Sequence, residues 1–406
     1  MSAGVPFTTP PDDEPRDPIH AVRHADPYPY YARMTAEAPF AHHPSLGLWV
    51  ASDAASVEAV LTSPICRVRP AAEPVPRALA GSPAGEVFGH LVRMNDGPIH
   101  DQRKRAVSEA LDGLDPERVA ARARRWGQTL ASAIAPDDAS ALNELLFALP
   151  AHVIASLLGT PDDAVPAAAK MAGDLARAFA PAATKEHLAA GSAAASGLLD
   201  LVRSQRRSGD DDTLLGALAA QAGPSPDGDA AFAILANAVG FLTQAYEATA
   251  GLTALALVTL AALPDARARL REGRALIPFL AEVARYDSPV QNTRRFVAED
   301  GEVSGCALKQ GEAILVLLAA ANRDPRANAD PHHFDETRIN RRLFTFGIGP
   351  HACPGESLAT TIAACGIGAL LDRGLDPGRL DPHPAFRPSA NVRIPVLAMR
   401  GGKEDA

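Results

Sequence analysis

Alanine and leucine recur at helical spacing along most of the 406-residue chain, with charged residues between them. Apolar positions that repeat every three or four residues predict helices with one buried face. Clusters of proline and glycine, such as Pro70–Pro76 and Ala222–Gly228, separate these segments. The segments predicted to be helical are Asp53–Leu61, His100–Leu111, Pro116–Ala135, Ala141–Leu158, Asp163–Phe179, Lys185–Arg207 and Asp229–Leu263, with a further helix-like run at Ser357–Leu371.

Strand patterns are few and short, and they occupy Leu48–Ala51, Ala313–Leu318 and Val392–Ala398. We find no internal repeat and no linker that would divide the chain into separate cores. The pattern therefore predicts a mainly α fold, a helical domain with small peripheral β-sheets. We expect a flexible amino-terminal segment at residues 1–20, followed by a single domain over residues 21–406.

Composition narrows the class of protein. The hydrophobic content of 47% supports a large core, while 21% charged residues and a net charge of −9 favour a soluble acidic protein that binds no nucleic acid. The first residues, Met1–Asp17, lack the apolar core of a signal peptide. The longest nearly uninterrupted apolar stretch, Thr249–Leu263, is too short to span a bilayer. We therefore expect a cytoplasmic protein without a membrane anchor.

One cysteine stands in an unusual loop sequence, FGIGPHACPG, which runs from Phe346 to Gly355. Its glycines allow tight backbone geometry, and amide groups near the start of the following helix can stabilise a negative sulfur. We expect the loop to present Cys353 as a thiolate, with Phe346 as a surface for a flat cofactor. The alternative is an ordinary surface cysteine. The other cysteines, without metal-site or disulfide spacing, are Cys66, Cys306 and Cys365.

The spacing F-G-x-G-x-H-x-C-x-G in this loop resembles the haem-binding loop of the cytochrome P-450 superfamily, and in particular its soluble bacterial members. The resemblance implies the cytochrome P-450 fold, a helical domain with small sheets around a buried haem. It implies haem b as the cofactor, with Cys353 as the axial ligand of the metal. Phe346 and Gly355, as positions of the same motif, are expected to contact the haem.

Residues outside the loop extend the resemblance. Asp26–Tyr31 resembles the amino-terminal helix of the family, and Glu282 and Arg285 have its E-x-x-R spacing. Ser288–Gln291 follows this pair, as the corresponding sequence does in the family. A carboxylate and a guanidinium three residues apart share one helix face and can form a buried pair. The resemblance implies a structural network that Arg338 completes.

Haem carries two propionates, whose burial requires cations. The resemblance assigns this role to His100 and Lys104 in one helix, to Arg295 and to the loop residue His351. Lys104 keeps the charge of the more usual arginine but lacks its fork of donors. Two alternatives remain open, since His100 could be a helix-surface histidine and Arg294 could take the place of Arg295.

The long apolar helix departs from the family pattern A-G-x-[DE]-T. The aligned residues are Gln244–Ala248, with Thr249 next. Residues four apart share a helix face, so Gln244 and Ala248 should face the oxygen-binding side of the haem. Ala248 has no hydroxyl, and Thr249 lies about 100° further around the helix. Ala245 in place of glycine should weaken a local kink. The residues expected to act in catalysis are Gln244, Glu247, Ala248 and Thr249.

Two interpretations of the missing hydroxyl are open. In the first, Gln244 or a substrate hydroxyl organises the water, and the protein is a monooxygenase that inserts oxygen by ferryl-type oxidation. In the second, hydrogen abstraction from an N–H or O–H leads to C–C or C–N coupling or cyclisation without oxygen insertion. Two further alternatives are a peroxide-using enzyme and a non-catalytic haem-dependent ligand-binding protein.

Partners follow from the same resemblance. We expect electrons from a ferredoxin and its reductase, because no flavin or iron–sulfur segment accompanies the haem loop. Two groups of basic residues could face an acidic electron carrier, with a solvated charged face as the alternative: Arg103, Lys104 and Arg105, and Arg338, Arg341 and Arg342. The protein is predicted to be a monomer that acts on a small natural-product intermediate. Residues expected to line the substrate pocket are Leu235, Val239, Gln244, Val290, Asn292, Asn391 and Val392.

Overall fold

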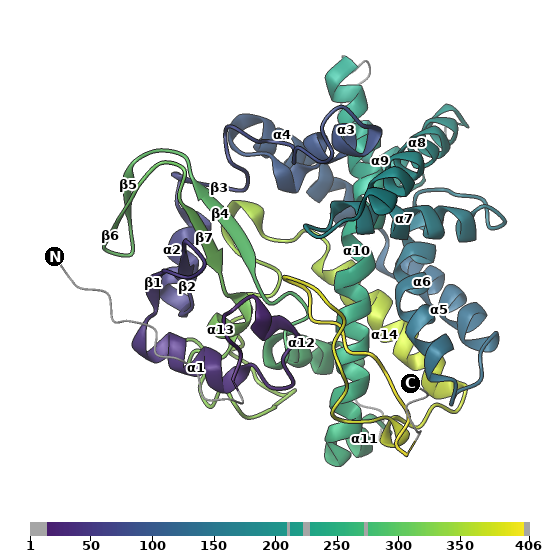
Figure 1. Ribbon diagram of the computed structural model, residues 1–406. Coiled ribbons are helices and arrows are strands. Elements are labelled where there is room, and N and C mark those ends of the chain that lie inside the picture. Colours follow the sequence, from purple (N-terminus) through teal and green to yellow (C-terminus); the bar gives the residue numbers. More distant parts are fainter. Residues whose placement is uncertain (1–13, 209–211, 222–227, 272–274, 402–406) are drawn as a thin grey trace. The chain divides into compact units, whose positions relative to one another are not determined.

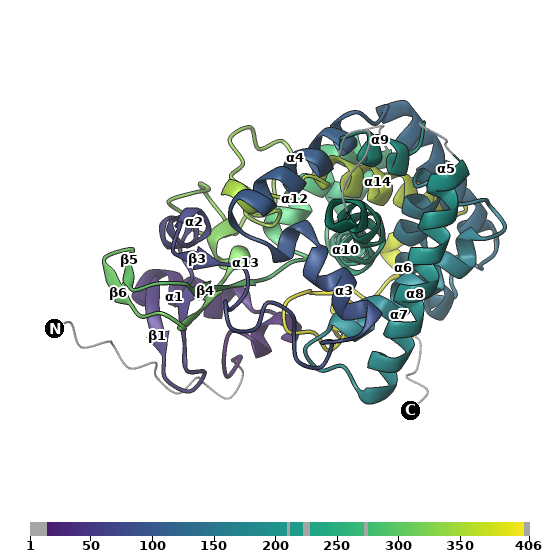
Figure 2. The same cartoon turned by 90° about the horizontal axis from the view of Figure 1, so that it is seen from above.

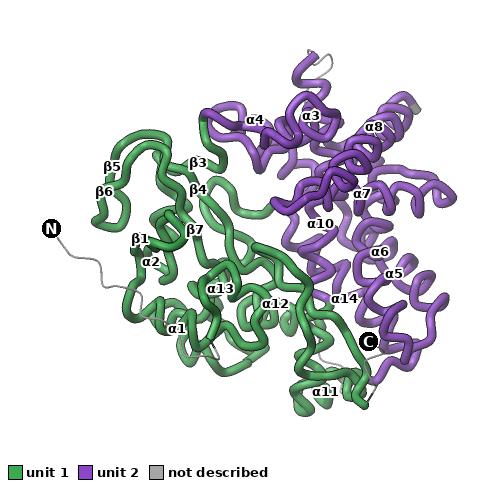
Figure 3. Tube along the Cα trace, viewed as in Figure 1, with its two compact units in different colours: residues 1–71, 254–353, 377–406 green, residues 72–253, 354–376 purple. Residues whose placement is uncertain are grey.

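The computed structural model describes residues 14–208, 212–221, 228–271 and 275–401. Contacts group the chain into two compact units, coloured separately in Figure 3. Unit 1 comprises residues 1–71, 254–353 and 377–406, and unit 2 comprises residues 72–253 and 354–376. The first 13 residues of the predicted flexible segment lie outside the described residues. The single domain over residues 21–406 stays a prediction.

A mixed five-stranded sheet is the main β-structure of unit 1 (Figure 1). The strands of this unit are β1 (Phe40–His43), β2 (Leu48–Ala51), β3 (Cys66–Arg67), β4 (Thr293–Val297), β5 (Gly301–Val303), β6 (Cys306–Leu308) and β7 (Ala313–Val316). The strand order is β1-β2-β7-β4-β3, while β5 and β6 form a separate hairpin. β2 and β7 are parallel, and β4 is antiparallel to β7, with Arg295 opposite Ile314.

Helices and one large apolar cluster complete unit 1. The helical elements that lie wholly within it are η1 (His20–Arg23), α1 (Tyr28–Glu37), α2 (Ala54–Thr62), α11 (Pro264–Arg271), α12 (Leu276–Tyr286), α13 (Leu318–Asn322), η3 (Gly349–His351) and η4 (Pro377–Arg379). The Asp53 side chain caps α2 by accepting from the Ser56 amide, at 2.9 Å. Val57 and Val60 of α2 then pack against Ile314 and Val316 of β7 in a buried cluster. This packing fixes α2 on the sheet.

Unit 2 is helical. Its elements are α3 (Pro83–His90), η2 (Val92–Met94), α4 (Gly97–Asp112), α5 (Pro116–Ser132), α6 (Ala139–Leu157), α7 (Val165–Phe179), α8 (Lys185–Ser208), α9 (Leu214–Gln221), α14 (Glu356–Asp372) and the first part of α10 (Gly228–Ala262). Figure 2 looks along α10, with α14, α6 and α3 on different sides of it. α14 packs closely on α5, since a Cβ at Gly127 would lie 3.2 Å from the Ala369 Cβ.

Most predicted helices are confirmed, with ends that shift by a few residues. α10 matches the segment Asp229–Leu263, and α14 matches the run Ser357–Leu371. The strand predicted at Val392–Ala398 is wrong, because this segment forms only isolated bridges, such as Val290 with Val392. Pro395 lacks an N–H for a continuous ladder. β4 was not predicted. Its two adjacent arginines interrupt the alternation of polar and apolar residues that marks a strand.

Among the described residues, α6 and α10 are long and apolar enough to cross a membrane by length and composition alone. The prediction that the apolar stretch of α10 is too short does not hold for the whole helix, which begins at Gly228. Within the structure, 72% and 67% of the most apolar windows of α6 and α10 are buried. This burial is what core helices of a globular protein show, and such helices pass the same test.

Candidate active site

The cysteine loop closes on itself within unit 1. The Cys353 amide donates to the Phe346 carbonyl at 2.7 Å, and the Ala352 amide donates to the Gly349 carbonyl at 3.0 Å. Gly347 and Gly349 have φ values of +68° and +69°, which residues with a Cβ rarely adopt. A Cβ at Gly349 would also lie 3.0 Å from the Thr62 Cγ2 of α2. The glycines that the motif requires are therefore the residues that let the loop fold.

Cys353 is the exposed member of the four cysteines, none of which forms a disulfide. Cys66 is 7% exposed, and burial raises the pKa of its thiol. Burial also raises the pKa of the half-buried Cys365 thiol. Within the described part of the chain, no group of three or more His, Cys, Asp or Glu residues could hold a metal ion. One accessible sulfur without companion ligands fits an iron that brings its own ring of nitrogen ligands, as haem does.

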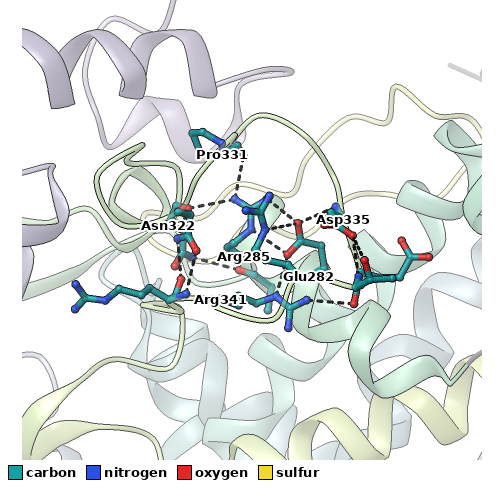
Figure 4. A network of polar contacts seen from close by, with 12 residues as sticks. Glu282, Arg285, Asn322, Pro331, Asp335 and Arg341 are labelled. Carbon is teal, nitrogen blue, oxygen red and sulfur yellow. Dashed lines mark hydrogen bonds and ion pairs between the residues drawn. The ribbon is translucent and has the colours of Figure 1, made fainter.

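Elsewhere in unit 1, a buried ion pair lies in a network of polar contacts (Figure 4). Glu282 and Arg285 of α12 are both 0% exposed, and the guanidinium donates to the carboxylate at 2.7 and 3.0 Å. Arg285 also donates to the carbonyls of Asn322 and Pro331, at 3.2 and 2.9 Å. Glu282 also accepts from the Asp335 amide at 3.0 Å. The E-x-x-R pair therefore fastens α12 to the segment that leads to the cysteine loop.

Two further arginines reach the same carboxylate. Arg341 Nε donates to Glu282 Oε2 at 2.9 Å, and Arg338 Nε forms an ion pair with Oε1 at 3.5 Å. Burial alone would raise the pKa of Glu282, but the hydrogen bonds and charge of Arg285, with Arg341, hold that pKa below its usual range. Sequence reasoning expected Arg338 to join this network, and its ion pair with Glu282 agrees with that prediction. The hydrogen bond from Arg341 was not predicted.

This geometry corrects the expected basic surface. The side chains of Arg338 and Arg341 are 12% and 14% exposed and direct their charges inward. Arg342 is 50% exposed and pairs with the surface residue Glu58. In unit 2, Arg103 is 10% exposed and pairs with Asp229 at 3.0 Å. Three of the arginines expected on a docking face are therefore engaged in internal contacts.

The residues expected near the haem propionates lie in both units. In unit 1, Arg295 of β4 is 5% exposed, while its neighbour Arg294 is exposed, which agrees with the predicted register. Arg295 donates to the Arg294 carbonyl at 2.9 Å. His351 lies half-buried in η3. In unit 2, α4 carries the half-buried Lys104 and His100, which is 3% exposed and therefore not a helix-surface histidine. Their contacts with propionates stay predictions.

The four expected catalytic residues lie in α10, within unit 2. Gln244, Glu247 and Ala248 are half-buried, whereas Thr249 is 1% exposed. The Thr249 hydroxyl has no hydrogen-bond partner among the described residues. Gln244 Nε2 donates to the Gly240 carbonyl at 2.9 Å, so the amide folds back along the helix. A Cβ at Gly240 would lie 2.9 Å from that nitrogen. Sequence reasoning missed this close approach of Gln244 to Gly240, one turn before it in α10.

The expected pocket residues differ in accessibility. Leu235 and Val239 of α10 are 9% and 0% exposed. In unit 1, Val290 is half-buried and pairs with Val392, which is 6% exposed. Asn292 donates to the Ala390 carbonyl at 2.9 Å, and Asn391 is exposed. Contact of these residues with a substrate stays a prediction.

Comparison with known proteins agrees with the loop and the fold. Residues 230–373 match the family model described as Cytochrome P450. The chain is 31% identical over 399 residues to cytochrome P450 monooxygenase PikC of Streptomyces venezuelae, which covers 94% of this chain and 92% of PikC. It is 29% identical over 371 residues to 6-deoxyerythronolide B hydroxylase of Saccharopolyspora erythraea, and this similarity covers 86% of this chain and 89% of the hydroxylase.

A solved structure supports the same assignment. The crystal structure of CalO2 superposes with a TM-score of 0.74 at 26% identity, covering 95% of this chain and 99% of CalO2. The similarity to PikC extends over nearly the whole length of both proteins, and the residues that match the family model include the cysteine loop. The chain therefore belongs to the cytochrome P450 family, whose cofactor is haem b held by a cysteine thiolate.

Proposed function

We propose that the protein is a haem-thiolate monooxygenase that oxidises a small natural-product intermediate in the cytoplasm, with electrons from a ferredoxin and its reductase. The observation that carries the proposal is the exposed Cys353 in a glycine loop that is closed by a hydrogen bond from the Cys353 amide to the Phe346 carbonyl. Family membership supports the oxidoreductase chemistry, and the two sequence relatives are named as a monooxygenase and a hydroxylase.

Different residues of the chain would hold the iron, balance the propionate charges and support the cysteine loop. Cys353 would hold the iron, and the bound haem would supply the activation of dioxygen. His100, Lys104, Arg295 and His351 would balance the propionate charges, because two buried carboxylates need cations. The Glu282–Arg285 pair would keep the loop in position without touching substrate, since both side chains are fully buried within unit 1.

Proton supply in this protein would depend on α10. Ala248 offers no hydroxyl, and the Thr249 hydroxyl is buried, so neither is suited to order water beside the haem. Gln244 is half-buried and polar, and its amide oxygen could hold a water while its nitrogen remains on the Gly240 carbonyl. We assign water positioning to Gln244 and proton supply to Glu247.

The missing hydroxyl at Ala248 also supports a second candidate function. Without a hydroxyl at Ala248, the protein could perform C–C or C–N coupling or cyclisation in which no oxygen enters the product. The hydroxylase and monooxygenase names of the relatives favour oxygen insertion. Turnover under labelled dioxygen separates the two functions, because one labelled oxygen in the main product supports insertion and its absence supports coupling.

A first experiment tests the thiolate. We expect the carbon monoxide complex of the reduced protein to show the Soret band typical of a thiolate ligand, and Cys353→Ala to abolish it. Cys66→Ala, Cys306→Ala and Cys365→Ala are the matched controls and should retain the band. A band that survives in Cys353→Ala would refute the assignment. Turnover with a ferredoxin, its reductase and NAD(P)H then distinguishes an enzyme from a haem protein that only binds a ligand.

A further inference from the structure

A surface pocket of unit 1 lies where α1, the end of α12 and the end of α13 meet. α13 contacts both α1 and α12, and the three helices lie side by side in Figure 1. The pocket has a volume of about 330 Å³, which is at the lower end of the range for small-molecule sites. Apolar and aromatic residues of α1 and α12 line it together with three polar residues, Asp26, Arg323 and His332. None of these three is among the residues expected to contact haem or substrate.

Two aromatic rings hold Arg323 in the wall of this pocket. Its guanidinium carbon lies 4.1 Å from the Tyr28 ring centroid and 3.6 Å from the Tyr286 ring centroid. Its Nε donates to the Tyr286 carbonyl at 2.7 Å. The Tyr28 ring is fixed in turn, because its hydroxyl donates to Asp287 at 2.8 Å. Two rings this close cover the faces of the guanidinium, so a ligand must approach Arg323 at its edge.

Arg323 differs from Arg285 and Arg393 in its lack of an acidic partner. Arg285 is 0% exposed and pairs with Glu282 at 2.7 Å. Arg393 is 2% exposed and pairs with Asp287 at 2.9 Å. Arg323 is 6% exposed, and it forms no ion pair with any described residue. Its Nη2 has no hydrogen-bond partner there and yet is not fully enclosed, so this nitrogen is open to the pocket. A buried charge without such a partner is costly, and an anion at Nη2 would stabilise it.

His332 supplies a second donor beside Arg323. Its Nδ1 lies 3.2 Å from Arg323 Nη1. A guanidinium can only donate, so Nδ1 accepts, and the neutral imidazole carries its proton on Nε2. Partial burial and the charge of Arg323 lower the pKa of His332, which keeps the ring neutral at neutral pH. His332 is exposed, and its Nε2 has no partner within the described part of the chain. The pocket therefore contains two donors that await an acceptor.

Asp26 restricts the kind of anion that this pocket can take. Its Oδ1 accepts from the Tyr28 amide at 3.1 Å, which fixes the carboxylate at the start of α1. Because this negative charge lines the same pocket, it repels a ligand with two negative charges more than a ligand with one. Pro29 and the tyrosine rings offer apolar surface to the rest of the ligand. The lining therefore favours a singly charged anion with an apolar part.

We propose that this pocket binds an organic monocarboxylate, whose oxygens accept from Arg323 Nη2 and His332 Nε2 and whose apolar part packs beside Pro29. A carboxylate is flat and matches the edge of a guanidinium, and hydrogen bonds between charged groups are the strong ones. The bonds form at the protein surface of unit 1 and involve no haem contact. The site therefore goes beyond the proposed oxidation and does not rest on it.

Isothermal titration calorimetry of the haem-loaded full chain tests the proposal. The probes are acetate, benzoate and 3-phenylpropionate, each compared with its neutral amide, and inorganic phosphate. The Soret band is recorded during each titration, because a probe that binds beside the iron changes this band. Binding at the haem is thus distinguished from binding in the pocket.

Four variants alter the pocket: Arg323→Gln, Arg323→Lys, His332→Phe and Asp26→Asn. Asp26→Asn removes the charge but keeps an acceptor oxygen at the start of α1. Arg77→Gln is the matched control, because it also removes one positive charge and the Arg77 side chain is 94% exposed in unit 2. Circular dichroism shows whether each variant is folded.

We expect at least one carboxylate to bind without a change in the Soret band, and its amide not to bind. Arg323→Gln and His332→Phe should each weaken the binding of that carboxylate at least about tenfold, or about 1.4 kcal/mol. Arg323→Lys should retain part of the affinity, since it keeps the charge and loses the fork of donors. Asp26→Asn should increase the affinity several-fold, and Arg77→Gln should leave it unchanged.

The proposal is overturned if no carboxylate binds in preference to its amide, or if the wild type, Arg323→Gln and His332→Phe have equal affinities. Phosphate that binds as tightly as the carboxylate would overturn the assignment to a monocarboxylate. If Arg323→Gln does not fold, His332→Phe and Asp26→Asn decide, because both substitutions change exposed residues. Unchanged affinity in these two variants would then contradict the proposal.

Discussion

Replacement of Arg341 by alanine tests whether the basic residues before the cysteine loop are structural or serve as a docking surface. Arg341 Nε donates to the fully buried Glu282 at 2.9 Å, and its side chain is 14% exposed. The next residue, Arg342, is 50% exposed and pairs with Glu58, whose side chain is 48% exposed. Two adjacent arginines therefore provide a matched comparison of an inward and an outward charge.

The structure sets the expected magnitudes. A hydrogen bond to a charged group contributes about 1.5–3 kcal/mol. Glu282 would keep the two bonds from Arg285 and the bond from the Asp335 amide, so we expect Arg341→Ala to lower the free energy of unfolding by about 2 kcal/mol. Arg342→Ala removes a solvent-screened pair and a contact 5.3 Å from the Phe344 ring centroid. That change should cost about 0.5–1 kcal/mol.

Urea unfolding of the haem-loaded protein, followed by circular dichroism and by haem absorbance, measures both free energies. Stopped-flow reduction by a ferredoxin supplies the second readout. We expect Arg342→Ala to slow reduction while leaving stability nearly intact, and Arg341→Ala to show the reverse. Equal destabilisation by the two substitutions, or an Arg341→Ala protein as stable as the wild type, would refute the assignment of Arg341 to the buried network.

Three further outcomes can be measured. The pKa of Glu282 is lower in the folded protein than in the unfolded chain, so its stabilising contribution is present above the unfolded pKa of about 4.3 and is lost as pH falls through the folded value; Glu282→Gln should lower stability at neutral pH and flatten the acid limb of a stability–pH curve. Gln244→Ala should reduce the turnover rate more than Ala248→Thr does, and a large gain in Ala248→Thr would contradict water positioning by Gln244. Reduction by an acidic ferredoxin should weaken with added salt, since the Debye length is about 8 Å at physiological ionic strength, and salt-independent reduction would argue against electrostatic docking.

The sequence by itself determined the helical character of the chain and its cysteine loop. Both depend on local patterns, because helix periodicity and the backbone freedom of Gly347 and Gly349 act within a few residues. Family resemblance in the same loop identified the cofactor, which the relationship to PikC supports. Local patterns also misled, since Val392–Ala398 has strand-like composition but forms only isolated bridges.

The tertiary structure decided which way long polar side chains point. Arg341 and Glu282 are 59 residues apart, so the inward direction of Arg341 could not be inferred from its basic neighbours. The same holds for Gly240, since a Cβ there would lie 2.6 Å from Leu91 Cδ2, which belongs to a distant part of the sequence. A flexible side chain takes its direction from the partners that the fold brings to it, and those partners are distant in sequence.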